Sequence, residues 1–118
     1  MSTPFPALSV WSRLQVALRA AMKERDTVAM SALRSALGAI SNAEAVPLSI
    51  AGLGGAEVRR RVLTEDEATA IAATEAADRR AAARDYQAAG HAGRADRLRR
   101  EARAIEAALD ITPSRDDA

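Results

Sequence analysis

Apolar residues recur at every third or fourth position in four stretches of the chain, which is the spacing of one face of an α-helix. The clearest stripes are Met30, Leu33, Leu37 and Ile40 in the second stretch, and Ala95, Leu98, Ala102, Ile105 and Leu109 in the fourth. We predict helices over about residues 10–25, 27–45, 65–89 and 92–110. Few residues separate the first two helices or the last two, so each pair is expected to form an antiparallel hairpin. The predicted fold is an all-α bundle of four main helices in two antiparallel hairpins.

Polar residues and a glycine mark the ends of these predicted helices. Ser9 is the N-cap candidate for the first helix, and Thr27, next to Asp26, is the candidate for the second. Thr64 is followed three residues later by an acid, which is the spacing of a capping box. Gly90 is expected to end the third helix, because glycine adopts the left-handed conformation that follows many helices.

The segments outside the helices define the expected domain limits. We expect residues 1–8 to be a flexible arm, residues 9–110 to form one helical domain, and residues 111–118 to be a disordered tail. The Gly-rich linker 46–62 lacks the Lys-Ser/Thr pair of a phosphate-binding loop, so we interpret it as a connector. Residues 57–61 are expected to form a short turn or to begin the third helix early, and no segment has the pattern of a strand.

Composition narrows the classes of function. Alanine is the commonest residue, aromatic residues make up 3%, and this mixture favours closely packed helices over sheets. The net charge of +1 gives no global basic field that would attract nucleic acid. The absence of cysteine excludes a disulfide scaffold and any thiolate metal site. No apolar run is long enough to span a membrane and no signal peptide is evident, so we expect a cytoplasmic protein without a membrane segment.

Side chains suited to catalysis are scarce. His91 is the only histidine, and a metal site or a general base would need further partners beside it. The serines lie outside any G-x-S-x-G motif, and the acids that open the third helix are explained by its positive end. We therefore predict no catalytic residue, no metal site and no cofactor.

Arg34 is the most interesting of the other charged residues, because it adjoins the buried stripe of the second helix. It is expected to pair with a carboxylate such as Glu67 or Glu75 of the third helix as a structural ion pair, and a contact with a ligand or with nucleic acid is the alternative. Glu44 lies near the negative end of the second helix, where an acid is unfavourable without a tertiary partner. A carboxylate–arginine site built from Arg34, Glu44 and Glu67 is the enzymatic alternative.

Four arginines of the last predicted helix are candidates for contact with RNA phosphates, namely Arg94, Arg97, Arg100 and Arg103. The last three repeat at every third position and would line one side of the helix. Glu101 and Glu106 interrupt this strip, and the few aromatic residues offer little surface on which bases could stack. A solvated helix face is the alternative interpretation.

Several short motifs occur in the order found in one known family. They are residues 21–26 (AMKERD), Leu33-Arg34, Asn42-x-Glu44, residues 63–67 (LTEDE), Arg79-Arg80, Tyr86-x-x-Ala89-Gly90, Arg94 and Glu101. Together they resemble the amino-terminal helical domain of the GatB/YqeY-like family, which is related to the tail of the tRNA-dependent amidotransferase B subunit. The resemblance covers about residues 10–109. The motif positions that it implies, interpreted as structural, are Lys23, Arg25, Asp26, Arg34, Asn42, Glu44, Glu67, Arg79, Arg80, Tyr86, Gly90 and Glu101.

This sequence also departs from the family pattern. Ala104 stands where the family has the second acid of an E-x-x-E pair, and three residues separate Gly90 from Arg94, where the family often has none. Because no counterpart of the family's carboxy-terminal helical domain is evident after residue 110, we expect the chain to correspond to the family's amino-terminal helical domain alone.

The resemblance implies a non-catalytic accessory module linked to tRNA-dependent amidation, with tRNA as a candidate partner. The family has a carbon–nitrogen ligase label, with glutamine as amido donor, but this chemistry lies in other parts of the amidotransferase. At most, the chain would be an accessory part of such an enzyme. The main alternative is a helical adaptor that binds another protein or forms a homo-oligomer and has no role with nucleic acid.

Overall fold

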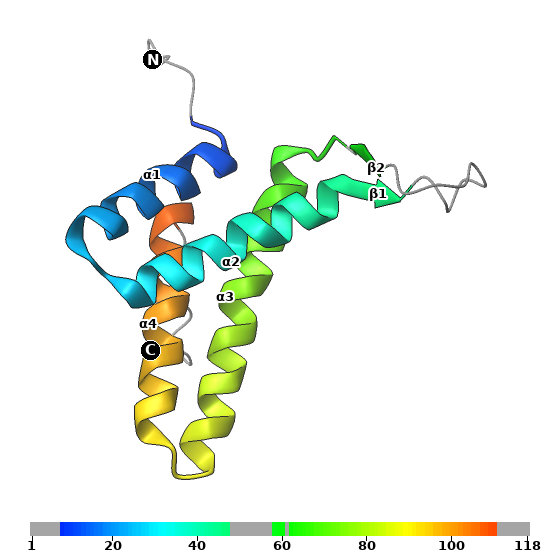
Figure 1. Cartoon of the computed structure of the whole chain (residues 1–118). Coiled ribbons are helices and arrows are strands. Elements are labelled where there is room, and N and C mark those ends of the chain that lie inside the picture. The colour runs from blue at the N-terminus through cyan, green and yellow to red at the C-terminus, as the bar shows by residue number, and fades with distance from the viewer. Residues whose placement is uncertain (1–7, 48–57, 61, 111–118) are drawn as a thin grey trace, which may run out of the picture.

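A computed structural model describes residues 8–47, 58–60 and 62–110, and within them it contains four main helices (Figure 1). The elements are α1 (Val10–Glu24), α2 (Thr27–Glu44), β1 (Ala45–Pro47), β2 (Val58–Arg60), α3 (Glu65–Ala88) and α4 (Ala92–Leu109). The arm expected at residues 1–8 lies outside the described residues except for Leu8, and the tail expected at 111–118 lies wholly outside them.

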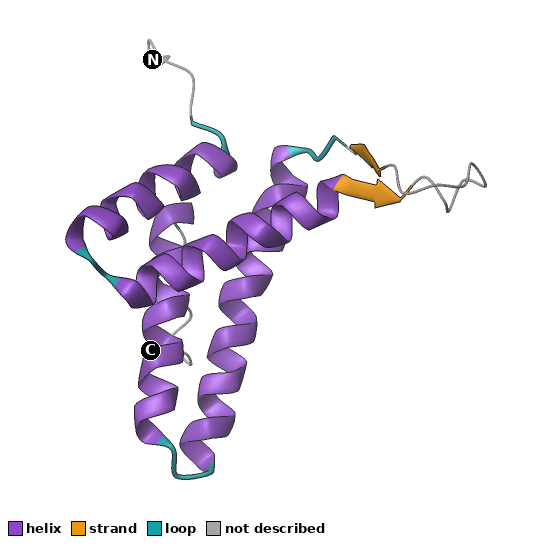
Figure 2. Ribbon diagram, viewed as in Figure 1, coloured by secondary structure: helices purple, strands orange, loops and turns teal. Residues whose placement is uncertain are grey.

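The predicted all-α fold is confirmed, with α1 packed on α2 and α3 packed along α4. The second hairpin is the longer one, and α2 lies across both of its helices (Figure 2). The carboxyl-terminal part of α4 also contacts α1, so the first hairpin covers one end of the second. The turn between α3 and α4 extends away from this junction and forms the opposite end of the molecule.

The core lies where α1 and α2 meet the second hairpin. Its largest fully buried side chains are Leu14, Leu33, Ile105 and Val10. The stripe predicted on α2 faces this core, with Met30 half-buried, and the stripe predicted on α4 contributes Ala102, Ile105 and Leu109 to it. Buried alanines on α2, α3 and α4 let the helices approach closely, because a methyl group takes up less space between two backbones than a longer side chain does.

The turn between α1 and α2 is built by two adjacent residues. Arg25 adopts the left-handed conformation, with φ of 59°, and closes α1, so the first helix ends one residue earlier than predicted. The N-cap of α2 is Asp26, whose Oδ1 accepts a hydrogen bond of 3.0 Å from the amide of Ala29. The choice of Thr27 as N-cap was wrong, because Thr27 is already the first helical residue and the carboxylate before it takes the amide.

The predicted ends of α3 agree with the structure. The hydroxyl of Thr64 accepts from the amide of Glu67 at 3.1 Å, and the carboxylate of Glu67 accepts from the amide of Thr64 at 3.0 Å, which completes the capping box. At the other end, Gly90 has φ of 86°, a conformation that residues with a Cβ rarely adopt. Glu65 has a second role beyond the helix end, because its Oε2 accepts from the amide of Val10 at 2.8 Å and joins α3 to the start of α1.

A short antiparallel strand pair was not predicted. Residues of β1 pair with those of β2 in the register Ala45↔Arg60, Val46↔Arg59 and Pro47↔Val58. Pro47 cannot continue α2, because proline has no backbone N–H. The pairing of β1 with β2 supplies the backbone hydrogen bonds that this part of the chain cannot make within a helix. The expectation of a turn or an early helix at residues 57–61 is therefore wrong for Val58–Arg60. The Gly-rich part of the linker, residues 48–57, lies outside the described residues.

Candidate nucleic-acid interface

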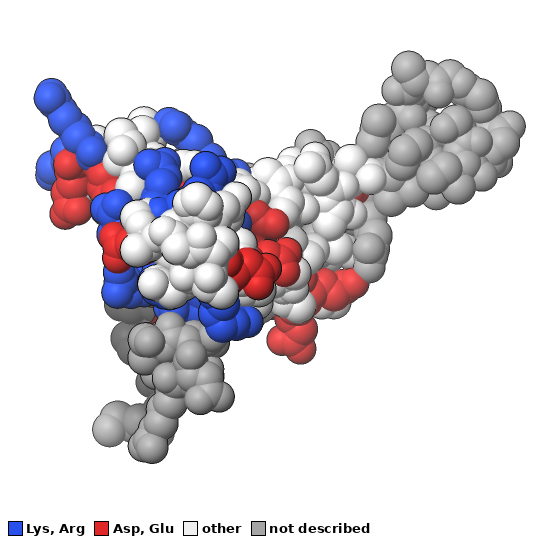
Figure 3. All heavy atoms as spheres, turned by 90° about the horizontal axis from the view of Figure 1, so that it is seen from below, with Lys and Arg blue, Asp and Glu red and all other residues white. Residues whose placement is uncertain are grey.

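Charge is unevenly distributed over the end of the molecule that carries the α3–α4 turn. Figure 3 views this end, and most of its blue Lys and Arg side chains lie on the left and in the middle, with some red carboxylates among them at the left edge. A group of carboxylates lies on the right, over α3. The exposed basic residues of α4 and of the α1–α2 turn outnumber the exposed acids Glu24, Asp26 and Asp96 of the same elements; they are Lys23, Arg25, Arg94, Arg97, Arg100 and Arg103. The small net charge of the chain therefore conceals a local basic surface.

A hollow of about 380 Å³ lies within this basic surface, between the α1–α2 turn and α4. Its lining residues are Asp26, Val28, Ala29, Arg100, Arg103 and Ala104. The turn contributes the amino-terminal end of α2, and α4 contributes the two guanidinium groups. Residues about 75 positions apart in the sequence thus form one surface, because α2 packs against α4.

The two arginines of the hollow are free to meet an anion. Arg100 Nε lies 3.3 Å from Asp96 Oδ2, but the side chains are 51% and 63% exposed, so water competes strongly with this pair. Arg103 is exposed and makes no hydrogen bond or ion pair with another described residue. An anion in the hollow would therefore displace little existing structure.

The other two arginines of the predicted strip do not line the hollow. The Arg94 guanidinium lies over the ring of Tyr86, with its carbon 4.9 Å from the ring centre. Arg97 Nε donates to Glu101 Oε2 at 3.2 Å, one helical turn away. The structure therefore places two of the four candidates at the hollow, whereas Arg94 lies at the α3–α4 turn and Arg97 pairs with Glu101.

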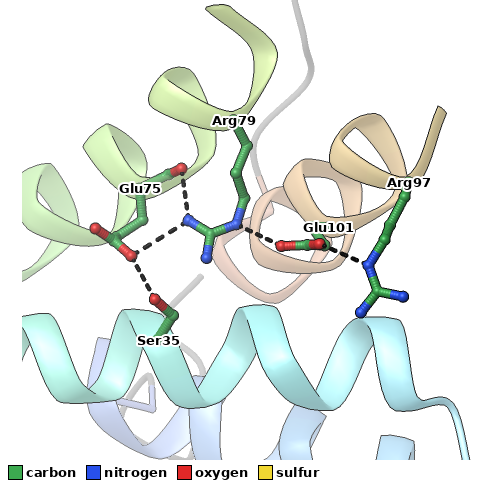
Figure 4. A network of polar contacts seen from close by, with 5 residues as sticks. All are labelled: Ser35, Glu75, Arg79, Arg97 and Glu101. Carbon is green, nitrogen blue, oxygen red and sulfur yellow. Dashed lines mark hydrogen bonds and ion pairs between the residues drawn. The ribbon is translucent and has the colours of Figure 1, made fainter. Parts of the chain in front are cut away.

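The family-motif residues Arg79 and Glu101 belong to a network of polar contacts between α2, α3 and α4 (Figure 4). Arg79 Nε donates to Glu101 Oε1 at 3.0 Å, and its Nη1 donates to Glu75 Oε1 at 3.3 Å. The hydroxyl of Ser35 on α2 donates to the same Glu75 oxygen at 2.9 Å. This network ties three helices together through Arg79 and Glu101.

Arg80 and Glu106 form a buried ion pair between α3 and α4. Arg80 Nε and Nη2 donate to the two oxygens of Glu106, each at 2.7 Å, and both side chains are less than 10% exposed. This two-point geometry is the strongest way in which arginine binds a carboxylate. Glu106 therefore does not interrupt a surface strip, as the sequence suggested, because it points into the interface between the helices.

The expected pairing of Arg34 with Glu67 or Glu75 is wrong. Arg34 is exposed on α2 and makes no hydrogen bond or ion pair with another described residue, and the next residue, Ser35, reaches Glu75 instead. Successive helical residues point about 100° apart, so one position separates a contact with α3 from open solvent. Asn42 is also exposed, and Glu44, the last residue of α2, is half-buried.

The enzymatic alternative around Arg34, Glu44 and Glu67 does not assemble. Arg34 and Glu44 are ten positions apart on one helix, which separates them by about 15 Å along its axis. The carboxylate of Glu67 caps α3, and none of the three residues lines the hollow beside α4. Among the described residues, no three His, Cys, Asp or Glu side chains are grouped so that they could hold a metal ion.

The described helices also differ from membrane-spanning ones. Within residues 8–47, 58–60 and 62–110, none combines the length and the apolar character that crossing a bilayer requires.

A family model describing YqeY-like proteins matches residues 11–113. The chain belongs to the YqeY-like family. A search of curated proteins and a search of solved structures found no match. The match agrees with the motifs noted in the sequence, and in the YqeY-like chain one of them reaches the hollow, since residues 21–26 lead into the α1–α2 turn and Asp26 lines the hollow.

In this YqeY-like chain, the sequence identified only some of the residues that line the hollow beside α4. Arg100 and Arg103 were identified from their spacing, but Asp26 was noted only as a motif residue and Val28 and Ala29 were not singled out. The signal that could have found them is the position of the motif 21–26 at the end of a helix, where the chain must turn back against a neighbour.

Proposed function

We propose that the chain is a non-catalytic, RNA-binding accessory module, and that it serves tRNA-dependent amidation of the kind its family is linked with. The observation that carries the proposal is the placement of Arg100 and Arg103, two exposed guanidinium groups, at a hollow beside the start of α2. Arginine presents several N–H donors in one plane and binds a phosphate through two of them at once.

The amino-terminal end of α2 also affects how the hollow interacts with an anion. Its first amides carry a partial positive charge, which favours a nearby anion. The Asp26 carboxylate offsets part of that charge, and it accepts from the amide of Ala29 and lies in the hollow. The net attraction of the hollow for an anion therefore depends on Arg100 and Arg103, so their removal is the decisive test.

Ala104 is a second support for an anion at this place. It lines the hollow at the position where the family resemblance gives an acid. A carboxylate there would stand close to Arg100 and Arg103 and would pair with them, which would weaken their attraction for phosphate. The small, uncharged side chain leaves both guanidinium groups available.

The adaptor alternative has weaker support. Among the described residues, the exposed large apolar side chains are Leu8, Val16, Met22 and Val62. Val16 and Met22 are six positions apart on α1, roughly 240° around the helix, so they do not share a face. Scattered apolar side chains are normal on a monomer, whereas a docking surface needs a continuous patch.

The experiment is a titration of purified protein into total tRNA at about 50 and 200 mM salt, with light scattering on the free protein. We expect micromolar binding that weakens steeply at the higher salt, because phosphate contacts release counterions. The variant Arg100→Ala/Arg103→Ala should weaken binding about tenfold or more. It should also reduce the slope of log affinity against log salt concentration by the amount expected for about two phosphate contacts.

The matched control is Arg19→Ala/Arg34→Ala. It removes two exposed positive charges from α1 and α2, away from the hollow, and should change tRNA affinity much less. Equal losses for both double variants would show that only net charge matters and would refute the site. A stable dimer without any tRNA binding would overturn the proposal in favour of the adaptor.

A further inference from the structure

A second cluster of side chains lies at the turn between α3 and α4, away from the hollow beside α2. The rings of Tyr86 and His91 meet edge to face, with centres 6.0 Å apart and planes at 70°. Arg94 lies over the Tyr86 ring from the first turn of α4. The chain has one tyrosine and one histidine, and the turn brings both of them beside an arginine.

This cluster borders its own hollow of about 450 Å³. The lining residues are Ala82, Asp85, Tyr86, Ala89 and His91. Two aromatic rings and two alanines give it apolar walls, and the carboxylate of Asp85 supplies a hydrogen-bond acceptor. Arg94 does not line the hollow, so its guanidinium holds the tyrosine ring without occupying the space.

His91 is an unusual residue for its position. It is the N-cap of α4, a place where Ser, Thr, Asp or Asn would accept a hydrogen bond from the helix, and its side chain makes no such bond. Its amide donates to the carbonyl of Tyr86 at 2.8 Å, which fixes the turn, while the imidazole remains exposed. A residue that gives up local stability in this way is typical of a functional position.

We propose that this hollow binds an unpaired nucleobase of RNA, and guanine in preference to adenine. Bases that are not paired stack on Tyr, His and Arg side chains in many RNA-binding proteins. Guanine presents two adjacent N–H donors on its pairing edge, and the carboxylate of Asp85 can accept both. Adenine offers only one donor group at that edge, beside a ring acceptor that a carboxylate repels.

The position of the hollow suits one RNA strand that also contacts the arginines of α4. Arg100 follows His91 by nine residues, about 14 Å along the axis of α4 and about 180° around it, so a strand that contacts both sites follows the surface of the helix for several nucleotides. In Figure 3, which looks onto this turn, an uncharged area is flanked by basic side chains on the left and by carboxylates on the right. The inference rests on the proposed RNA-binding function, but its site and its test are separate.

The test uses the fact that Tyr86 and His91 are the only residues of their types, so that their ring protons are recognised in a proton NMR spectrum without labelling. Guanosine 5′-monophosphate, adenosine 5′-monophosphate and ribose 5-phosphate are titrated separately into the full chain, to about 10 mM. A stacked base should shift both rings upfield and saturably. We expect the guanine nucleotide to bind about tenfold more tightly than the adenine nucleotide, and ribose 5-phosphate to cause no such shift.

Two variants sharpen the test. Asp85→Asn should reduce affinity for the guanine nucleotide about tenfold and leave the adenine nucleotide nearly unchanged. Tyr86→Leu should abolish the histidine shift for both. No base-dependent shift in the wild type, or equal shifts with ribose 5-phosphate, overturns the inference.

The same titrations on Arg100→Ala/Arg103→Ala separate the two proposals. If this variant loses tRNA and still binds the guanine nucleotide, both proposals are supported. If wild type binds tRNA but no nucleotide shifts the rings, the base site is refuted and the phosphate site stands. If nucleotides bind and tRNA does not, the RNA assignment is overturned.

Discussion

Two arginines of α3 are turned into the helix interface and two of α4 are exposed, although both helices carry closely spaced arginines in an alanine-rich sequence. Arg79 and Arg80 point toward α4 and pair with its glutamates at 2.7–3.0 Å. Arg100 and Arg103 are exposed at a hollow. The comparison shows that a basic cluster in a helical sequence divides into structural and available charges according to the acids on the neighbouring helix.

Glu101 connects the two groups. Its Oε1 accepts from Arg79 of the inward group, and its Oε2 accepts from Arg97 of the outward group. The two contacts differ in strength because water competes more with the more exposed arginine. The exposed fraction of the side chain is 17% at Arg79 and 51% at Arg97. The same carboxylate therefore makes one strong contact and one weak contact.

The largest effect is expected from Arg80→Leu. Removing one partner of a buried ion pair leaves Glu106 charged and unpaired, which costs about 3–5 kcal/mol of unfolding free energy. Urea unfolding followed by circular dichroism measures the loss. The double variant Arg80→Leu/Glu106→Leu should recover most of it, because two apolar side chains can pack without a stranded charge. A loss below about 1 kcal/mol for the single variant would contradict the buried geometry.

A smaller effect is expected from Glu101→Gln. The amide keeps the shape of the side chain but loses the charge that both Arg79 and Arg97 meet, at a cost of about 1.5–3 kcal/mol. The measurement is again urea unfolding. An unchanged midpoint would mean that the network in Figure 4 does not contribute to stability.

Ala104→Glu tests the outward group without removing any arginine. The new carboxylate would stand in the hollow with Arg100 and Arg103 and should weaken tRNA binding roughly 3–10-fold. Fluorescence anisotropy with labelled tRNA measures the change. Ala77→Glu, on an exposed position of α3, adds the same charge elsewhere. If the control weakens binding as much as Ala104→Glu, the hollow is not the contact.

The smallest effect is expected from Arg97→Ala. Its ion pair with Glu101 is half-exposed, so the loss of unfolding free energy should stay below about 0.5 kcal/mol. Arg79→Ala, made in parallel, should cost several times more, because it removes the buried contacts of the same network. Equal losses would mean that exposure does not separate the two groups of arginines.

The sequence predicted the fold because apolar spacing determines helix faces. The stripes that contain Leu33 and Ile105 face the core, and the capping box at Thr64 forms as expected. The strand pair was missed because pairing depends on two short segments meeting after a long linker, and neither has a strand pattern of its own.

The candidate sites were only partly predictable. Arg80 lies in a stripe with Ala72, Ala76 and Ala83, so its burial could have been predicted from that spacing. The hollow beside α2 could not, because it depends on how the α1–α2 turn meets α4. The meeting of Tyr86 and His91 depends on a turn with left-handed Gly90 at its centre, and spacing alone does not give that geometry.

The buried pair of Arg80 and Glu106 has a consequence for the alignment of α3 along α4. The alanine-rich faces of the two helices are smooth. Small side chains alone would only weakly oppose the sliding of α3 along α4. A slip by one turn, about 5.4 Å, would carry the guanidinium out of reach of its carboxylate and strand two charges in the interface. Together with the Arg79–Glu101 contact, this ion pair thus selects a single register for the long hairpin, and with it the spacing between the two hollows.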